Sequence, residues 1–220
     1  MTPPNTFLPL TSGRVDGTRY AHEVHDLGTV RVPSGRLEAS DPFVTLGEGL
    51  VVAVPPGDHP VRVTVADVSE GQDGTHLREA YLSVVLADGV AVRSETLTPE
   101  GREPASDGEF YGVGVDAGTV GFADADAIAR CMPEGNWYET VFDNGRPDAW
   151  FDRMDDESHL RGGCANIIMP AAAAGENVVL CHSGWGDGYY PVVGTYDADG
   201  RLLGVHLDLL VDEAPAVDED

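Results

Sequence analysis

Lysine is absent from this chain of 220 residues. All thirteen basic residues are arginines and they face 38 aspartates and glutamates, which gives a formal net charge of −25 at pH 7. Binding to DNA or RNA depends on basic side chains that displace counterions from phosphates, so this charge excludes a nucleic-acid-binding protein. An anionic membrane surface repels the chain for the same reason. A basic protein is the macromolecular partner that such a charge favours.

Long apolar runs are also missing. No stretch approaches the roughly 20 apolar residues that a membrane-spanning helix needs. The first residues, MTPPNTFLPLTSG, contain no basic stretch followed by an apolar one. We therefore expect a cytoplasmic protein without a membrane segment.

Cysteine is scarce, with Cys131, Cys164 and Cys181 the only three. An odd number without a CxxC pair excludes a disulfide framework and a zinc ribbon. We expect reduced thiols packed among apolar neighbours. The seven histidines show no HxH or HExxH spacing, so the sequence identifies neither a metal site nor a cofactor.

Glycine and proline are abundant, with 27 and 15 residues, and they interrupt the chain at short intervals. Between these breaks apolar and polar residues alternate, as in strands that bury one face. The segments with this pattern are 29–32, 50–54, 61–65, 76–87, 111–115, 177–181, 190–196 and 201–210. The pattern predicts a mainly β fold, an antiparallel β-sandwich or flattened barrel. We expect a flexible segment at 1–19, a single β domain at 20–211 and an acidic C-terminal tail at 212–220.

Turn and cap residues predict the connections. Asp88-Gly89 predicts a hairpin from the strand at 76–87 into 90–93, and Asp199-Gly200 predicts one between 190–196 and 201–210. Helical spacing is rare and gives two short helices, at 124–132 and 148–154. Because both are short, we expect them to cover a sheet edge or an end of the sandwich.

The densest anomaly is a glycine-rich loop at 183–188, Ser-Gly-Trp-Gly-Asp-Gly. Glycines at such density indicate unusual backbone angles or the close approach of a ligand. In a functional interpretation the loop presents Asp187 and backbone N–H groups, with Trp185 as a stacking wall. In a structural interpretation it is a tight turn that Asp187 caps while Trp185 fills the core. Both interpretations remain open.

A second loop, at 116–124, carries Asp116, Gly118 and Thr119 from a strand to the start of a helix at Asp124. Such a placement brings a carboxylate close to free N–H donors. The structural alternative makes Asp124 a helix N-cap and Asp116 a turn residue. Because both glycine-rich loops end strands, we predict that they lie side by side.

Together these motifs resemble the bacterial family of unknown function DUF4241. The resemblance rests on Gly35 with Asp41-Pro42, on Asp116-Ala-Gly-Thr119, and on Ser183-Gly-Trp-Gly-Asp-Gly188, and it spans about residues 28–211. Family members often have Gly-Cys after the Asp-Ala-Gly-Thr string, where this chain has Val120-Gly121, so no thiol role is placed there. The resemblance implies no particular activity.

Two function classes follow. The first is a small-ligand-binding or protein-interaction β domain, with its site at the 183–188 loop and a small molecule or a basic protein as partner. Its ligand-binding candidates are Thr119, Ser183, Gly184, Trp185, Gly186, Gly188 and Tyr190. The alternative is a hydrolase or lyase in which Asp116, Asp124 and Asp187 converge as acid/base groups or as ligands of a divalent cation. Convergence of these carboxylates in one concave pocket would favour the enzyme.

Overall fold

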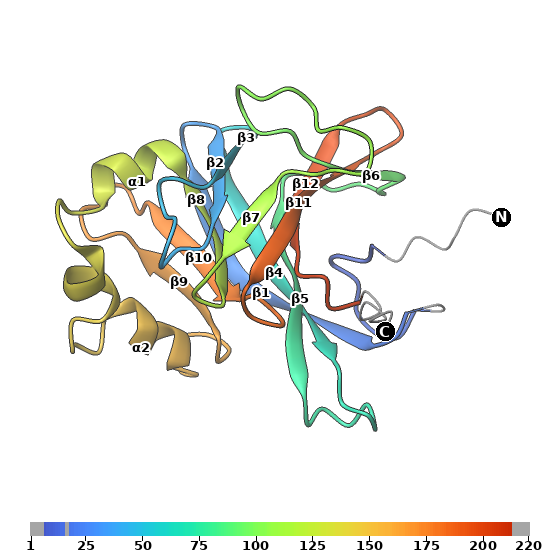
Figure 1. Cartoon of the computed structure of the whole chain (residues 1–220), viewed down its shortest axis with the longest axis horizontal. Coiled ribbons are helices and arrows are strands. Elements are labelled where there is room, and N and C mark those ends of the chain that lie inside the picture. The colour runs from blue at the N-terminus through green and yellow to red at the C-terminus, as the bar shows by residue number, and fades with distance from the viewer. Residues whose placement is uncertain (1–6, 16–17, 213–220) are drawn as a thin grey trace, which may run out of the picture.

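Two antiparallel β-sheets and a layer of short helices make up the protein (Figure 1). The computed structural model describes residues 7–15 and 18–212. The larger sheet has seven strands in the order β1-β4-β5-β12-β11-β6, with β7 also paired to β11, and the smaller has the order β3-β2-β8-β10-β9. The strands are β1 (Ala21–Val32), β2 (Arg36–Ser40), β3 (Leu50–Ala53), β4 (Gly57–Asp67), β5 (Leu77–Val85), β6 (Arg93–Thr96), β7 (Gly112–Val115), β8 (Thr119–Asp124), β9 (Cys164–Ile168), β10 (Asn177–His182), β11 (Gly188–Tyr196) and β12 (Leu202–Asp208). The prediction of a mainly β sandwich is confirmed.

The five-stranded sheet is buried on both faces. In β10, Val179 and Cys181 face the core between the two sheets, whereas Val178 and Leu180 face a second core beneath the helices. Successive side chains of a strand point to opposite faces, so a strand between two apolar layers is apolar at nearly every position. The unbroken run of apolar residues in β10 is therefore the sequence signature of a middle layer.

Three helical segments form the outer layer over this sheet, on the left in Figure 1. They are α1 (Ala125–Cys131), the π-helical turn η1 (Tyr138–Phe142) and α2 (Trp150–Asp155). The two predicted α-helices are present, but they cover a sheet face, not an edge or an end as we expected. The apolar side chains of the helices form the second core together with those of the sheet, and this packing places the helices on the face of the sheet. None of the helices in the described part of the chain is long and apolar enough to cross a membrane.

One of the two predicted hairpins is wrong. The turn at 197–200 joins β11 to β12 as expected, but Asp88-Gly89 does not return the chain to pair with β5. After β5 the backbone amides of Leu86 and Ala87 donate to the carbonyl of Leu203, and that of Val92 donates to the carbonyl of Tyr196. The chain thus passes over the end of the β11–β12 hairpin and pairs as β6 with β11. The Asp88-Gly89 signal depends only on the residues of the turn. The edge of β5 that the predicted hairpin would use is paired with β12 instead.

The three cysteines are free and buried, as predicted. Residues 1–6 and 16–17 of the expected flexible segment at 1–19, and all of the expected acidic tail at 212–220 except residue 212, lie outside the described residues. Of the first segment, residues 7–15, 18 and 19 are described, and Gly13 forms an isolated bridge with His22.

A histidine is buried in the larger sheet, on the face turned away from the core. His206 is 1% exposed, and its ring nitrogens contact Ser83 Oγ at 2.9 Å and Thr195 Oγ1 at 3.0 Å. Phe7 covers it with an edge-on ring contact. Burial disfavours the charged imidazolium and lowers the pKa of His206 to about 3. The folded protein thus holds this imidazole neutral.

This burial predicts a loss of stability in acid. An unfolded histidine has a pKa of about 6.5, so the unfolded chain binds an extra proton as the pH falls through that value, while His206 in the folded chain binds it only near the folded pKa of about 3. The contribution of His206 is therefore complete above pH 6.5 and is lost progressively toward pH 3. Between neutral pH and about pH 4, we expect the free energy of unfolding to fall by several kcal/mol more in wild type than in His206→Gln. Urea unfolding measures this difference. A His76→Gln control, at an exposed position, should keep the wild-type slope; identical slopes for all three proteins would contradict the assignment.

Candidate functional site

The two glycine-rich loops are the points at which the chain crosses from one sheet to the other. Residues 116–118 lead from β7, which pairs with β11 of the larger sheet, to β8 of the smaller one. Residues 183–187 lead from β10 of the smaller sheet back to β11. The amide of Ser183 donates to the carbonyl of Gly118 at 3.0 Å. The loops lie side by side, as the sequence predicts, but the first is shorter than the predicted 116–124, because residues 119–124 form strand β8. We call the two loops together the crossing corner.

A fully buried carboxylate holds the first loop in place. Asp41 follows β2, and its Oδ2 accepts the backbone N–H groups of Asp116 at 3.0 Å and Ala117 at 2.8 Å. Its Oδ1 accepts the hydroxyl of Thr119 at 2.7 Å. Pro42 lies so close to Gly121 that an added Cβ would be 2.6 Å from its ring. The motifs Asp41-Pro42 and Asp116-Ala-Gly-Thr119 therefore form one structural unit.

The second loop uses most of its polar groups internally. The hydroxyls of Ser183 and Tyr190 both donate to the carbonyl of Gly186 at 2.7 Å. Gly184 has φ of +64°, and a Cβ there would approach the carbonyl oxygen of Glu79 and the side chain of Val211 to 2.8 Å each. Only glycine fits this position. These contacts support the structural interpretation for Ser183, Gly184, Gly186 and Tyr190.

The structure brings two of the three candidate catalytic carboxylates together. Val115 of β7 pairs with Gly188 of β11. Asp116 follows Val115 and Asp187 precedes Gly188, and both aspartates are exposed. Asp124 lies at the opposite end of β8 and is fully buried. Its Oδ1 accepts the Ala127 amide at 2.7 Å as the N-cap of α1, and its Oδ2 accepts the amide and hydroxyl of Ser34.

The remaining candidates divide by exposure. Thr119 is buried on Asp41, and Gly188 belongs to β11. Trp185 is 54% exposed, so it does not fill the core; it lies beside the His76 ring and under the Arg78 guanidinium. Within residues 7–15 and 18–212, no group of three or more His, Cys, Asp or Glu side chains is placed to hold a metal ion.

Comparison with known proteins finds one family. The sequence model of DUF4241, described as a protein of unknown function, matches residues 30–207, about four-fifths of the chain. The chain belongs to the DUF4241 family. No curated protein and no solved structure matches it significantly.

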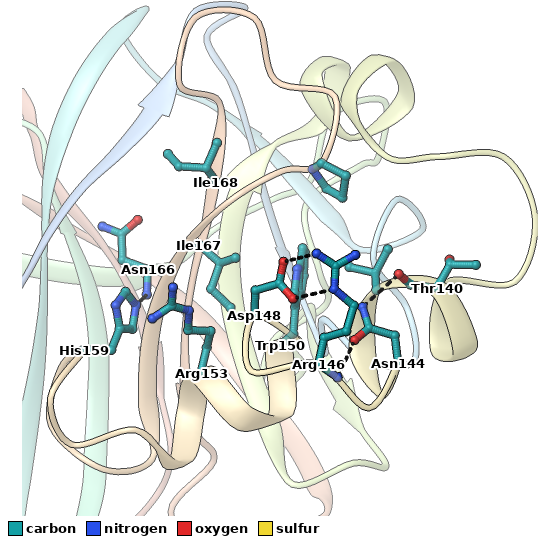
Figure 2. Close-up of a pocket in the computed structure, with 12 residues that line it drawn as sticks. Thr140, Asn144, Arg146, Asp148, Trp150, Arg153, His159, Asn166, Ile167 and Ile168 are labelled. Atoms are coloured by element: carbon teal, nitrogen blue, oxygen red, sulfur yellow. Dashed lines mark hydrogen bonds and ion pairs between the residues drawn. The ribbon is translucent and has the colours of Figure 1, made fainter.

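A cavity of about 500 Å³ opens in the helical layer of the DUF4241 domain, away from the crossing corner. Its walls come from η1, the segment between η1 and α2, α2 itself and the edge strand β9, and we call it the β9 cavity (Figure 2). The residues that line it are Thr140, Val141, Asn144, Arg146, Asp148, Trp150, Arg153, His159, Asn166, Ile167, Ile168 and Pro170.

The lining combines an apolar base with a polar rim. Trp150 and Ile167 are buried, at 2% and 8% exposure. Figure 2 shows Arg153 and His159 on one side of the cavity and Arg146 with Asn144 on the other. The Asp156 carboxylate adjoins this rim, and its pKa is lowered, chiefly by hydrogen bonds from Ser158 and further by the positive charge of Arg153.

Sequence reasoning missed this cavity. Its residues lie in the segment 140–170, which carries five aspartates and one glutamate against three arginines, so the arginines give no local excess of positive charge. The wall also depends on η1, a π-helical turn that the apolar spacing does not predict. π-Helical turns are rare and occur often at functional sites. Only the assembled helical layer reveals the site.

The crossing corner predicts a large difference between Asp41 and its exposed neighbours. Asp41→Ala leaves two backbone N–H groups and the hydroxyl of Thr119 without their acceptor, so we expect the free energy of unfolding to fall by about 3 kcal/mol. Asp116→Asn and Asp187→Asn, at exposed positions, should change it by less than about 0.5 kcal/mol. Urea unfolding measures all three. Equal losses would show that the buried carboxylate does not anchor the loop.

Proposed function

We propose that this DUF4241 domain binds a small molecule in the β9 cavity. The observation that carries the proposal is the cavity itself. Its volume of about 500 Å³ falls within the range typical of small-ligand pockets. Such pockets usually have an apolar base below a few convergent polar groups, and here the buried side chains of Trp150 and Ile167 form that base.

The position of the cavity supports the same function. Binding sites commonly lie on connecting segments held by a rigid scaffold. Here the scaffold is the five-stranded sheet, fixed by cores on both faces, and the connecting segments are η1 and the turn before α2. The candidate residues of the 183–188 loop bond mainly to one another, and this favours the β9 cavity over the loop as the ligand site.

The hydrolase or lyase alternative lacks this kind of support. It requires Asp116, Asp124 and Asp187 in one pocket, and Asp124 is used as a buried helix cap at the far end of β8. A binding domain is therefore the function that the geometry favours.

A cavity-filling substitution tests the proposal. Ile168 lines the cavity and is 58% exposed, so Ile168→Trp should place an indole in the opening without disturbing either core. We expect a thermal-shift screen of carboxylates, phosphate esters, sugars and nucleosides to yield a ligand that raises the melting temperature of wild type. The apparent affinity of that ligand for Ile168→Trp should be at least tenfold lower than for wild type.

The matched control is Leu77→Trp, an exposed leucine of β5 outside the cavity, which should bind as wild type does. A ligand whose shift survives in full in Ile168→Trp does not occupy the β9 cavity, and the proposal would then be wrong.

A second candidate function is the binding of a basic protein at the crossing corner. The observation that favours it is the adjacency of exposed Asp116 and Asp187, whose carboxylates have no hydrogen-bond partner in the described part of the chain, with the exposed ring of Trp185 on the same loop as Asp187. Carboxylates and an aromatic face both attract guanidinium groups.

A labelled nona-arginine peptide tests this second candidate by fluorescence polarisation at about 0.15 M salt, where general attraction is screened. Asp116→Asn/Asp187→Asn should weaken binding several-fold. Asp107→Asn/Asp199→Asn removes the same charge from exposed positions elsewhere and should have less than about a twofold effect. Equal effects of the two double substitutions would show that net charge alone causes the attraction, and they would refute a site at the crossing corner.

A further inference from the structure

Arginines make up a larger share of the charged residues in the lining of the β9 cavity than in the whole chain. The chain has 38 acidic residues against 13 basic ones, whereas two arginines and one aspartate line this cavity. With the adjoining carboxylate of Asp156, the rim carries two charges of each sign, so it is neutral in a protein whose net charge is −25.

The two arginines of the cavity differ in how fully they are paired. Arg146 binds both oxygens of Asp148, with Nε to Oδ1 at 3.1 Å and Nη2 to Oδ2 at 3.2 Å. Arg153 has Asp156 as its ion-pair partner, at 3.6 Å from Nη1 to Oδ2, which is beyond hydrogen-bond distance. The other oxygen of Asp156 accepts from the amide and hydroxyl of Ser158. Among the described residues, no side chain accepts a hydrogen bond from the Arg153 guanidinium.

His159 supplies a second donor on the same side of the cavity. Its Nε2 lies 3.3 Å from the backbone nitrogen of Asn166 and accepts that N–H. A neutral imidazole carries one proton, so the proton of His159 resides on Nδ1 and can be donated. The two amide side chains of the lining are already engaged, Asn166 with the carbonyls of Leu27 and Thr29 and Asn144 with the carbonyl of Thr140.

We infer that the cavity takes a small organic anion whose carboxylate or phosphate group binds to Arg153 and His159. This inference rests on the proposed function and names the ligand class of the same site. A guanidinium offers paired N–H groups that match the two oxygens of a carboxylate or phosphate. The body of the anion then lies over the apolar base formed by Trp150 and Ile167.

Calorimetric titration of the full chain tests the ligand class, with succinate and inorganic phosphate as anions and succinamide as the uncharged analogue. The salt concentration is held at about 0.15 M so that the overall negative charge is screened. We expect at least one anion to bind and succinamide to bind at least tenfold more weakly. The stronger of the two anions identifies the carboxylate or the phosphate group as the preferred chemistry.

Substitutions at Arg153 test the residue. Arg153→Gln should weaken anion binding about 10- to 100-fold, and Arg153→Lys should fall between Gln and wild type because lysine keeps the charge but loses the fork. Arg102→Gln, an exposed arginine outside the cavity, is the control and should bind as wild type does. The melting temperature of each variant without ligand separates loss of binding from loss of folding.

The outcomes distinguish this inference from the proposed function. Binding of succinamide as tight as that of succinate, abolished by Ile168→Trp, would overturn the anion class and leave the small-molecule site intact. Anion binding that survives both Arg153→Gln and Ile168→Trp would overturn both. Absence of any Arg153-dependent anion binding up to about 20 mM overturns the inference.

Discussion

The hydrogen bonds to the buried carboxylate of Asp41 connect the motifs of the family with the architecture of the fold. In a sandwich, a chain that leaves one sheet must turn sharply to enter the other, and the backbone N–H groups of that turn lose their strand partners. At residues 116–118 Asp41 accepts two of these N–H groups, and it accepts the hydroxyl of Thr119 as well. A buried charge is tolerated here because several donors surround it.

The second crossing depends on the first. The Ser183 amide donates to Gly118, so the position of the loop at 183–187 is set by the loop that Asp41 holds. Beyond the crossings, β7 pairs with β11 on one side and β8 pairs with β10 on the other. The two connections thus fix the position of one sheet relative to the other at this corner. A Cβ has no room at Gly121 beside Pro42, nor at Gly184 beside the carbonyl of Glu79 and the side chain of Val211.

The sequence was sufficient for most strands of the larger sheet, for β3 and β10, for the hairpin at 197–200 and for the adjacency of the glycine-rich loops, because alternation and turn residues act over short distances. It predicted no strand at β2, β6 or β9, and it placed β8 in a loop. It failed where distant segments decide. Asp88-Gly89 has the composition of a hairpin turn, but β12 pairs with β5 and carries the chain past it. Asp116 and Asp124 are close in sequence, yet the extended length of β8 separates them. The β9 cavity needs η1, α2 and β9 to be assembled before any of its residues meet.

In the crossing corner the most specific motifs have structural roles. Residues such as Asp41, Ser183 and Gly184 are constrained by burial and backbone geometry, so changing them alters the fold before it alters any ligand. Arg153 and Ile168 lie on the helical layer and the edge strand, where side chains contact solvent and a change leaves both cores intact. In a fold whose middle sheet is buried on both faces, the side chains of that sheet are used for packing, and the helical layer over it has a face in contact with solvent. That layer is where the Arg153 guanidinium and the apolar base of the β9 cavity meet.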